Sequence, residues 1–278
     1  MRPLWLGALL AAVPLEYAYP WAEDGHSIVA EIAQRRLSDA ARQAVDRVLK
    51  HGSLASVSSW ADDIKFTERP DTKPWHFVDI PVAESTYDPA TECVDDACVI
   101  AALTNLTPDL QCGKDDKTKL DALRFVVHFV GDIHQPLHTV KDATGGNAIP
   151  VNVNICGLVK PGCTPQTESV NFHEAWDETL IKRTIFDWGA YVDRLESGWL
   201  QTPEAQAVAA DGTGPEQWAL QTHVAAQFVW NRKPADNVLD ESYYNDVLPI
   251  IDKQLGTAGL RLARFLNEAY SPATCPAK

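Results

Sequence analysis

The spacing of apolar side chains predicts a mostly helical chain. Within residues 21–37, Ile28, Val29 and Ile32 fall on one face of a helix that starts after a first turn. Ser38 is expected to cap the N-terminus of a second helix, because its hydroxyl can accept a hydrogen bond from a free backbone amide. The same spacing predicts helical segments at 58–65, 98–110 (in part), 115–133, 170–185, 218–230 and 248–270.

Extended segments are few and short. Residues 145–154 contain turn glycines followed by β-branched residues, which predicts a loop with one or two strands. Residues 75–81 are expected to be extended because Pro81 disfavours helix before it, and residues 82–97 read as a polar loop. The pattern therefore predicts a mainly α, single-domain, multi-helix fold with a small β element over residues 21–278.

The first twenty residues are typical of a secretory signal peptide. A short basic start is followed by the apolar run 4–15, which is too short to cross a bilayer. Cleavage directly before Trp21 would leave Ala18 at position −3 and Pro20 at position −1. No other segment has about eighteen consecutive apolar residues, so no membrane span is expected. We therefore expect a secreted or periplasmic protein, with 1–20 removed.

The six cysteines fit that compartment, where disulfides persist. Six cysteines allow fifteen connectivities. Two of these pairings would close short local loops, Cys93 with Cys98 and Cys156 with Cys163.

The net charge of the protein limits how it could bind a nucleic acid or another phosphate-rich partner. At −14 the chain has no broad basic surface that could follow a phosphate backbone. A protein of this charge that handles phosphates needs a local source of positive charge, and bound metal ions are one such source.

Candidate metal ligands concentrate in the segment HFVGDIHQPLH, residues 128–138. In a helix His128 and Asp132 lie four residues apart and therefore on the same face. Pro136 ends the helix, so His138 can return to the same region from the loop. Burying imidazole and carboxylate groups is costly unless they are paired, and a metal ion would pair them.

The rest of the chain supplies further ligands of the same type. NFHEAWD places His173 and Asp177 four residues apart on another helix. A lone buried histidine is usually a hydrogen-bonded core residue, so the argument depends on the number of candidates. His134 is expected to support the ligands rather than bind metal, and His51 and His223 are interpreted as core or surface residues. The candidate ligands are His26, Asp62, His76, His128, Asp132, His138, His173 and Asp177.

The order of these clusters resembles the zinc-dependent, single-strand-specific type I nucleases of fungi and plants, which include the 3'-nucleotidases. The resemblance extends from Trp21 to about Asn267. It rests on HFVGDIHQPLH, GGN, NFHEAWD and QLGTAGLRLARFLN. The joint order and spacing of these motifs make the resemblance specific.

The resemblance implies three zinc ions. The first would be held by Asp62, His76, His128 and Asp132. The second would be held by His26, by Asp132 as a bridge, and by the free amine and carbonyl of Trp21. The third would be held by His138, His173 and Asp177.

The resemblance also implies roles in catalysis and substrate binding. Asp62, Asp132 and Lys65 would be catalytic, with Lys65 standing where the family commonly has arginine. Phe77 and Asp79 would bind a base by stacking and hydrogen bonding. The implied function is a secreted endonuclease that cleaves single-stranded DNA and RNA to 5'-mononucleotides and also acts on 3'-nucleotides.

Two alternatives stay open at the level of sequence. A zinc phospholipase C shares the fold and the three-metal arrangement, but carries Glu at the position of Asp177 and lacks the WHFVD segment. A secreted protein with purely structural zinc is the other alternative. A monomer is expected by default, while the preference for DNA, RNA or a particular base is not readable from the sequence.

Overall fold

The computed structural model describes residues 21–271, and the expected signal peptide lies outside these residues. Most of the described chain is helical, which confirms the mainly α prediction. The helices are α1 (Glu23–Gln34), α2 (Asp39–Leu49), α3 (Trp60–Ile64), α4 (Pro89–Glu92), α5 (Val99–Cys112), α6 (Asp116–Asp132), α7 (Phe172–Glu174), α8 (Leu180–Thr184), α9 (Trp188–Ser197), α10 (Pro203–Ala210), α11 (Pro215–Arg232) and α12 (Glu241–Ala269).

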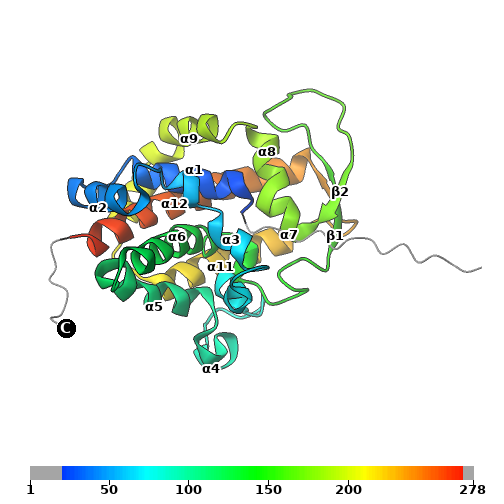
Figure 1. The fold of residues 1–278 in the computed structure, drawn as a ribbon. Helices are drawn as coiled ribbons and strands as arrows, with labels where there is room; N and C mark the ends of the chain where they lie inside the picture. The colour runs from blue at the N-terminus through cyan, green and yellow to red at the C-terminus, as the bar shows by residue number, and fades with distance from the viewer. Residues whose placement is uncertain (1–20, 272–278) are drawn as a thin grey trace, which may run out of the picture.

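The helix α6 lies in the middle of the molecule, beside α1 and α12 (Figure 1). Its start is fixed by Asp115, whose side chain accepts a hydrogen bond from the backbone amide of Thr118. All residues from 125 to 132 are buried, so the last two turns of α6 are enclosed on every side. This segment carries the first part of the HFVGDIHQPLH motif into the core.

The longest helix, α12, packs against α1 along much of its length. Gly259 permits the close approach: a Cβ atom at this position would lie 2.4 Å from a side-chain carbon of Ile32 on α1. Ser38 caps α2 as expected, because its hydroxyl accepts a hydrogen bond from Ala41. The apolar side chains of these helices belong to one continuous core.

A small sheet lies at one end of the helical layers (Figure 1). The central strand β1 (Pro150–Asn154) pairs antiparallel with β2 (Glu168–Asn171) and parallel with β3 (Val238–Asp240). Val151 and Val153 face the core while Asn152 between them is exposed, as the two-residue repeat of a strand requires.

Two local expectations were wrong. Residues 82–97 are not simply a loop, because Asp88 caps the short helix α4 and a 3-10 turn follows at Val94–Asp96. Trp75 and His76 end a 3-10 helix, and the extended chain begins only at Phe77. Helices α9 and α10 and strand β3 had not been expected.

The expected helix at 170–185 is interrupted. Val170 belongs to β2, because pairing with Val151 in β1 overrides the local helical pattern. Asn171 then caps α7, a π-helical turn follows at Ala175–Thr179, and α8 completes the segment. Such π-helical turns are frequent at functional sites. This one carries the candidate ligand Asp177.

The two local disulfides are confirmed, Cys93 with Cys98 and Cys156 with Cys163. Within residues 21–271, no helix is both long and apolar enough to cross a membrane.

Candidate metal centre

The carboxylate of Asp132, at the end of α6, stands at the centre of a group of buried histidines. Its oxygens lie 2.9 Å from Nδ1 of His76, 3.1 Å from Nε2 of His128 and 3.4 Å from Nε2 of His26. His26 comes from α1, His76 from the 3-10 helix Pro70–His76, and His128 from α6 itself. Three segments that are distant in the chain thus converge on one carboxylate.

A second carboxylate completes this group. Asp62 lies on α3, and its Oδ1 atom is 3.3 Å from Nε2 of His128 and 3.5 Å from Nδ1 of His76. The ammonium group of Lys65, one helical turn further on, lies 2.5 Å from the same oxygen. The five expected ligands His26, Asp62, His76, His128 and Asp132 therefore form one continuous cluster.

The remaining candidate ligands, which are those expected to hold the third ion, form what we call the third group. His138 lies on the 3-10 turn Pro136–Thr139, His173 on α7, and Asp177 in the π-helical turn. The Asp177 carboxylate is 3.3 Å from Nε2 of His173 and 3.9 Å from Nε2 of His138. His173 and Asp177 are thus four residues apart, with His173 in an α-helix and Asp177 in the π-helical turn that follows it.

Three of the histidines are oriented by the protein backbone. In each, Nδ1 donates a hydrogen bond to a carbonyl oxygen, which leaves Nε2 to face a carboxylate or the neighbouring ligands. The acceptors are the carbonyls of Ser58 for His128 (2.7 Å), His76 for His138 (2.9 Å) and Gly145 for His173 (2.7 Å). Such bonds fix the tautomer and the ring orientation of metal-binding histidines in proteins.

The geometry fits bound metal ions. Ligand atoms of a tetrahedral site with bonds of about 2.0–2.1 Å are separated by about 3.3 Å, and the nitrogen–oxygen distances around Asp62 and Asp132 are 2.9–3.5 Å. In the described part of the chain, the buried polar atoms without a hydrogen bond include Nε2 of His76, Oδ1 of Asp132 and Oδ2 of Asp177. Buried polar atoms are costly without a partner, so the described His/Asp groups are suited to hold ions.

Burial and neighbouring charges shift the pKa values in the metal-free protein. Burial lowers the pKa of His173 to about 4, and it lowers that of His76 to about 4 although the Asp132 carboxylate opposes the shift. For His128, burial is outweighed by the carboxylates of Asp132 and Asp62, which raise its pKa to about 10. Burial raises the pKa of Asp177 well above its usual range. Because the pKa of His128 lies above neutral pH, metal binding at neutral pH must displace a proton from His128.

Trp21 lies beside the third group. Its backbone nitrogen donates a hydrogen bond to Oδ1 of Asp177 at 3.2 Å, and its side chain is fully buried. Its φ angle of 25° is in the left-handed region, which is unusual for a residue other than glycine. The position of the nitrogen next to Asp177 is compatible with a ligand role for Trp21.

Gln135 contributes to the site although it was not among the expected residues. Its side-chain amide donates to Oδ1 of Asp177 at 2.5 Å, while its side-chain oxygen accepts from the backbone amide of Leu137. It thus connects the turn that carries His138 to the carboxylate of Asp177. A polar residue between two candidate ligands in HFVGDIHQPLH is the only signal for it in the sequence.

The other histidines are not ligands in this arrangement. His134 is buried, but its ring bonds to the carbonyl of Val130 (2.7 Å) and to the guanidinium of Arg261 (2.9 Å). The expectation that it supports the ligands directly is therefore wrong. His223 is a core residue whose ring bonds to two backbone carbonyls, and His51 is exposed.

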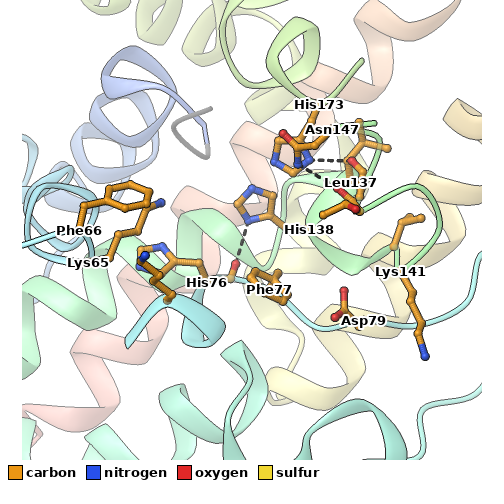
Figure 2. Close-up of a pocket in the computed structure, with 14 residues that line it drawn as sticks. Lys65, Phe66, His76, Phe77, Asp79, Leu137, His138, Lys141, Asn147 and His173 are labelled. Atoms are coloured by element: carbon orange, nitrogen blue, oxygen red, sulfur yellow. Dashed lines mark hydrogen bonds between the residues drawn. The ribbon is translucent and has the colours of Figure 1, made fainter. Parts of the chain in front are cut away.

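A cavity of about 390 Å³ opens onto both groups of ligands (Figure 2). His76, His138 and His173 form part of its wall, and the more deeply buried Asp132 and Asp177 do not line it. The other residues of the wall are Lys65, Phe66, Lys73, Phe77, Asp79, Leu137, Val140, Lys141, Thr144, Gly145 and Asn147.

The expected substrate-binding residues are in this wall. Phe77 is 38% exposed and Asp79 is half-buried. Burial raises the pKa of Asp79, and the charge of Lys141 opposes the shift. Figure 2 shows Asp79 and Lys141 on one side of His76, with Lys65 and Phe66 on the other.

A helical fold that holds buried His/Asp groups beneath an open cavity defines a protein suited to bind several metal ions next to a substrate. The S1/P1 Nuclease family model matches residues 21–271, and the chain belongs to this family. It is therefore a phosphodiester-bond hydrolase of the endonuclease type.

Several known nucleases are similar in sequence to almost the whole length of this chain. Endonuclease 3 of Arabidopsis thaliana is 29% identical over 96% of this chain and 95% of its own length. Nuclease S1 of Aspergillus oryzae is 29% identical over 94% of each chain. Nuclease P1 of Penicillium citrinum is 29% identical over 90% of this chain and 98% of its own.

Proposed function

We propose that this protein is a zinc-dependent endonuclease that cleaves single-stranded DNA and RNA to 5'-mononucleotides and also hydrolyses 3'-nucleotides. The observation that carries the proposal is the cavity that joins candidate metal ligands to lysines and exposed aromatic rings. The similarity to nucleases S1 and P1 supports the same function.

Zinc is the proposed metal because imidazole nitrogen and carboxylate oxygen are among its usual ligands. Bound zinc would supply Lewis-acid chemistry, activating water and offsetting negative charge on the phosphoryl and leaving oxygens. The first two ions would share the continuous cluster, with Asp132 between them and Trp21 completing the second site. The third ion would be held by His138, His173 and Asp177.

Lys65 is proposed to act on the phosphoryl group. Its side chain is buried against Asp62 but lines the cavity, so its charge faces the space next to the ligands. An ammonium group in a site of low dielectric stabilises negative charge that develops in the transition state. Asp62 holds Lys65 in this position.

Phe77 and Asp79 are proposed to bind the base of the nucleotide that supplies the leaving 3'-oxygen. A base stacks on an exposed aromatic ring whatever its identity, which is worth about 1–3 kcal/mol. Only an unpaired base can present its face in this way, and this explains a preference for single strands. The three lysines of the cavity supply local positive charge in a chain of net charge −14.

Two other functions are less well supported. The family match and the relatives named as nucleases favour a nuclease over a zinc phospholipase C. Purely structural zinc sites are closed by four protein ligands. The third group has three candidate side chains, two of which line the cavity, and this favours an open catalytic site.

We propose that residues 1–20 are a signal peptide and that residues 21–278 form a single secreted or periplasmic domain that acts as a monomer. The local disulfides are compatible with an oxidising compartment. Cleavage before Trp21 would convert the nitrogen beside Asp177 into an amine that can bind metal.

Product analysis tests the proposal. Protein beginning at Trp21 is incubated with single-stranded DNA, single-stranded RNA and phosphatidylcholine, with and without a chelator. Release of 5'-mononucleotides that stops with the chelator and returns with zinc is expected. Release of phosphocholine instead would identify a phospholipase, and zinc binding without any product would identify a structural role.

A further inference from the structure

A second exposed aromatic ring lines the cavity, at the end away from Asp79. Phe66 follows Lys65 directly after helix α3, and its side chain is 36% exposed. Figure 2 shows Phe66 with Lys65 on one side of His76, while Asp79 and Lys141 lie on the other. The candidate ligand His76 therefore lies between two aromatic positions, Phe66 and Phe77.

Two ammonium groups lie close to the ring of Phe66. The ammonium groups of Lys65 and Lys73 lie 5.3 and 4.8 Å from the centre of its ring. Lys73 is exposed on the neighbouring 3-10 helix Pro70–His76. Asp79 is the only acidic residue among those that line the cavity in the described structure, and it lies at the other end. Phosphate groups are therefore attracted to the Phe66 end.

The 5'-to-3' direction of the bound polynucleotide determines which of its nucleotides can reach the Phe66 end of the cavity. In the proposed function, on which this inference rests, Phe77 and Asp79 bind the nucleoside that supplies the leaving 3'-oxygen. The scissile phosphate then lies over the ligands. The next nucleotide, joined to that phosphate through its 5'-oxygen, must continue away from Phe77.

We propose that Phe66 and Lys73 form a second nucleotide subsite, which binds the nucleotide on the 3' side of the scissile phosphate. The ring of Phe66 stacks on the base, and Lys73 contacts the following phosphate. Because Lys73 is exposed, its contact with the ring is weaker than a base stack, so a base can displace its ammonium group towards the phosphate. The subsite makes the enzyme favour polynucleotides over 3'-mononucleotides, which end at the scissile phosphate.

The test compares three substrates that differ only in how far they extend beyond that phosphate. They are 3'-AMP, the dinucleoside monophosphate ApA, and an oligoadenylate of about 20 nucleotides. In Phe66→Ala, kcat/KM for ApA and for the oligonucleotide is expected to fall by about tenfold relative to that for 3'-AMP, within the range for loss of one base stack. In Lys73→Ala, only the oligonucleotide should be affected, because ApA has no following phosphate.

Two further variants of Phe66 distinguish the effect of aromatic stacking from the effect of side-chain size. Phe66→Tyr keeps an aromatic face and should keep the wild-type ratio, whereas Phe66→Leu should behave like Phe66→Ala. Phe186→Ala and Lys114→Ala are matched controls, because both residues are exposed and neither lines the cavity. Both controls should keep the wild-type ratios.

A binding readout complements the kinetics. The product 5'-AMP carries the phosphate and the downstream nucleoside, so it should compete with 3'-AMP through Phe66. Its inhibition constant is expected to rise by about tenfold in Phe66→Ala.

The outcomes distinguish the subsite from the proposed function. An equal loss for all three substrates would show that Phe66 only supports Lys65, and unchanged ratios would show that no base binds there; either result overturns the subsite. If the wild-type protein hydrolyses none of the three, the proposed function fails and the subsite fails with it.

Discussion

At the scale of single residues, Asp132 is central because its carboxylate faces four histidine rings. The distances are 2.9 Å to His76, 3.1 Å to His128, 3.4 Å to His26 and 3.5 Å to His138. These imidazoles are buried in one region, where each would be costly without a partner. One carboxylate between them is therefore placed where two neighbouring ions could share it, as proposed above.

Replacement of this carboxylate should remove more metal than replacement of any other single ligand. Asp132→Asn removes the shared charge, and zinc content measured by mass spectrometry should fall from about three ions to about one. Turnover should be lost, because the loss of a ligand exceeds the roughly 10–100-fold effect of losing an outer-shell partner. Asp62→Asn should remove about one ion.

A matched control lies next to Asp62 in α3. Asp63 is exposed, so Asp63→Asn should keep full metal content and activity. Near-normal activity or metal content in Asp132→Asn would contradict the assignment of Asp132 as the bridge.

At the scale of helices, the centre depends on how closely α6 approaches α1. Gly131 on α6 faces the ring of His26 on α1, and a Cβ atom at Gly131 would lie only 2.6 Å from Nδ1 of His26. The absence of a side chain at Gly131 thus allows the His26 ring to stack on His128 at a centroid distance of 3.9 Å. The contact between Gly131 and His26 therefore sets both the packing of α6 against α1 and the position of the His26 ring.

Gly131→Ala is therefore expected to displace His26. Because the His26 ring is buried, the added methyl group should cost about 1–3 kcal/mol of the free energy of unfolding, as is usual for overpacking. It should also weaken binding of the ion that His26 holds. Urea denaturation and metal analysis measure the two effects.

Gly256→Ala separates general overpacking from the effect on the ligand. A Cβ atom there would lie 2.3 Å from the ring of Trp199, which is not part of the metal centre. This variant should lose stability but keep its full metal content. Loss of metal in both variants to the same extent would contradict a specific role for Gly131.

At the scale of the whole molecule, the metal centre is a set of titratable groups that the fold buries together. In the metal-free protein, His76 and His173 have a pKa near 4, below the value of 6.5 expected in the unfolded chain. His128 has a pKa near 10, above that value. Acid and base should therefore destabilise the metal-free fold through different residues.

The direction in which pH changes the stability depends on whether the folded or the unfolded state binds more protons. For His76 and His173, the contribution to stability is present above pH 6.5 and is lost as the pH falls towards 4, by on the order of 3 kcal/mol per histidine. For His128, the contribution is present below pH 6.5 and is lost as the pH rises towards 10. Denaturation of chelator-treated protein should therefore show greatest stability near pH 6.5.

Zinc-loaded protein is the control for this profile. A liganded His128 carries no proton, so the loss of stability between pH 6.5 and 10 should disappear, and the loaded protein should be more stable at neutral pH. An identical profile with and without zinc would show that these histidines do not bind the metal.

The sequence by itself determined the features that depend on neighbouring residues. Helix α6 was predicted from 115 to 133 because its apolar pattern is local. The pairs His128 and Asp132, and His173 and Asp177, were found because residues four apart share a helix face. The acidic composition likewise excluded a broad basic surface.

Only the tertiary structure decided how these segments meet. Gln135 bonds to Asp177 and His138 bonds to the carbonyl of His76, and neither contact has a signal in local spacing. The strand at Val170 was missed because its partner β1 overrides the local pattern. Phe66 likewise became a candidate only when the fold placed it on the opposite side of His76 from Asp79. Contacts between distant segments depend on packing of the whole core, and a period of two or 3.6 residues does not encode them.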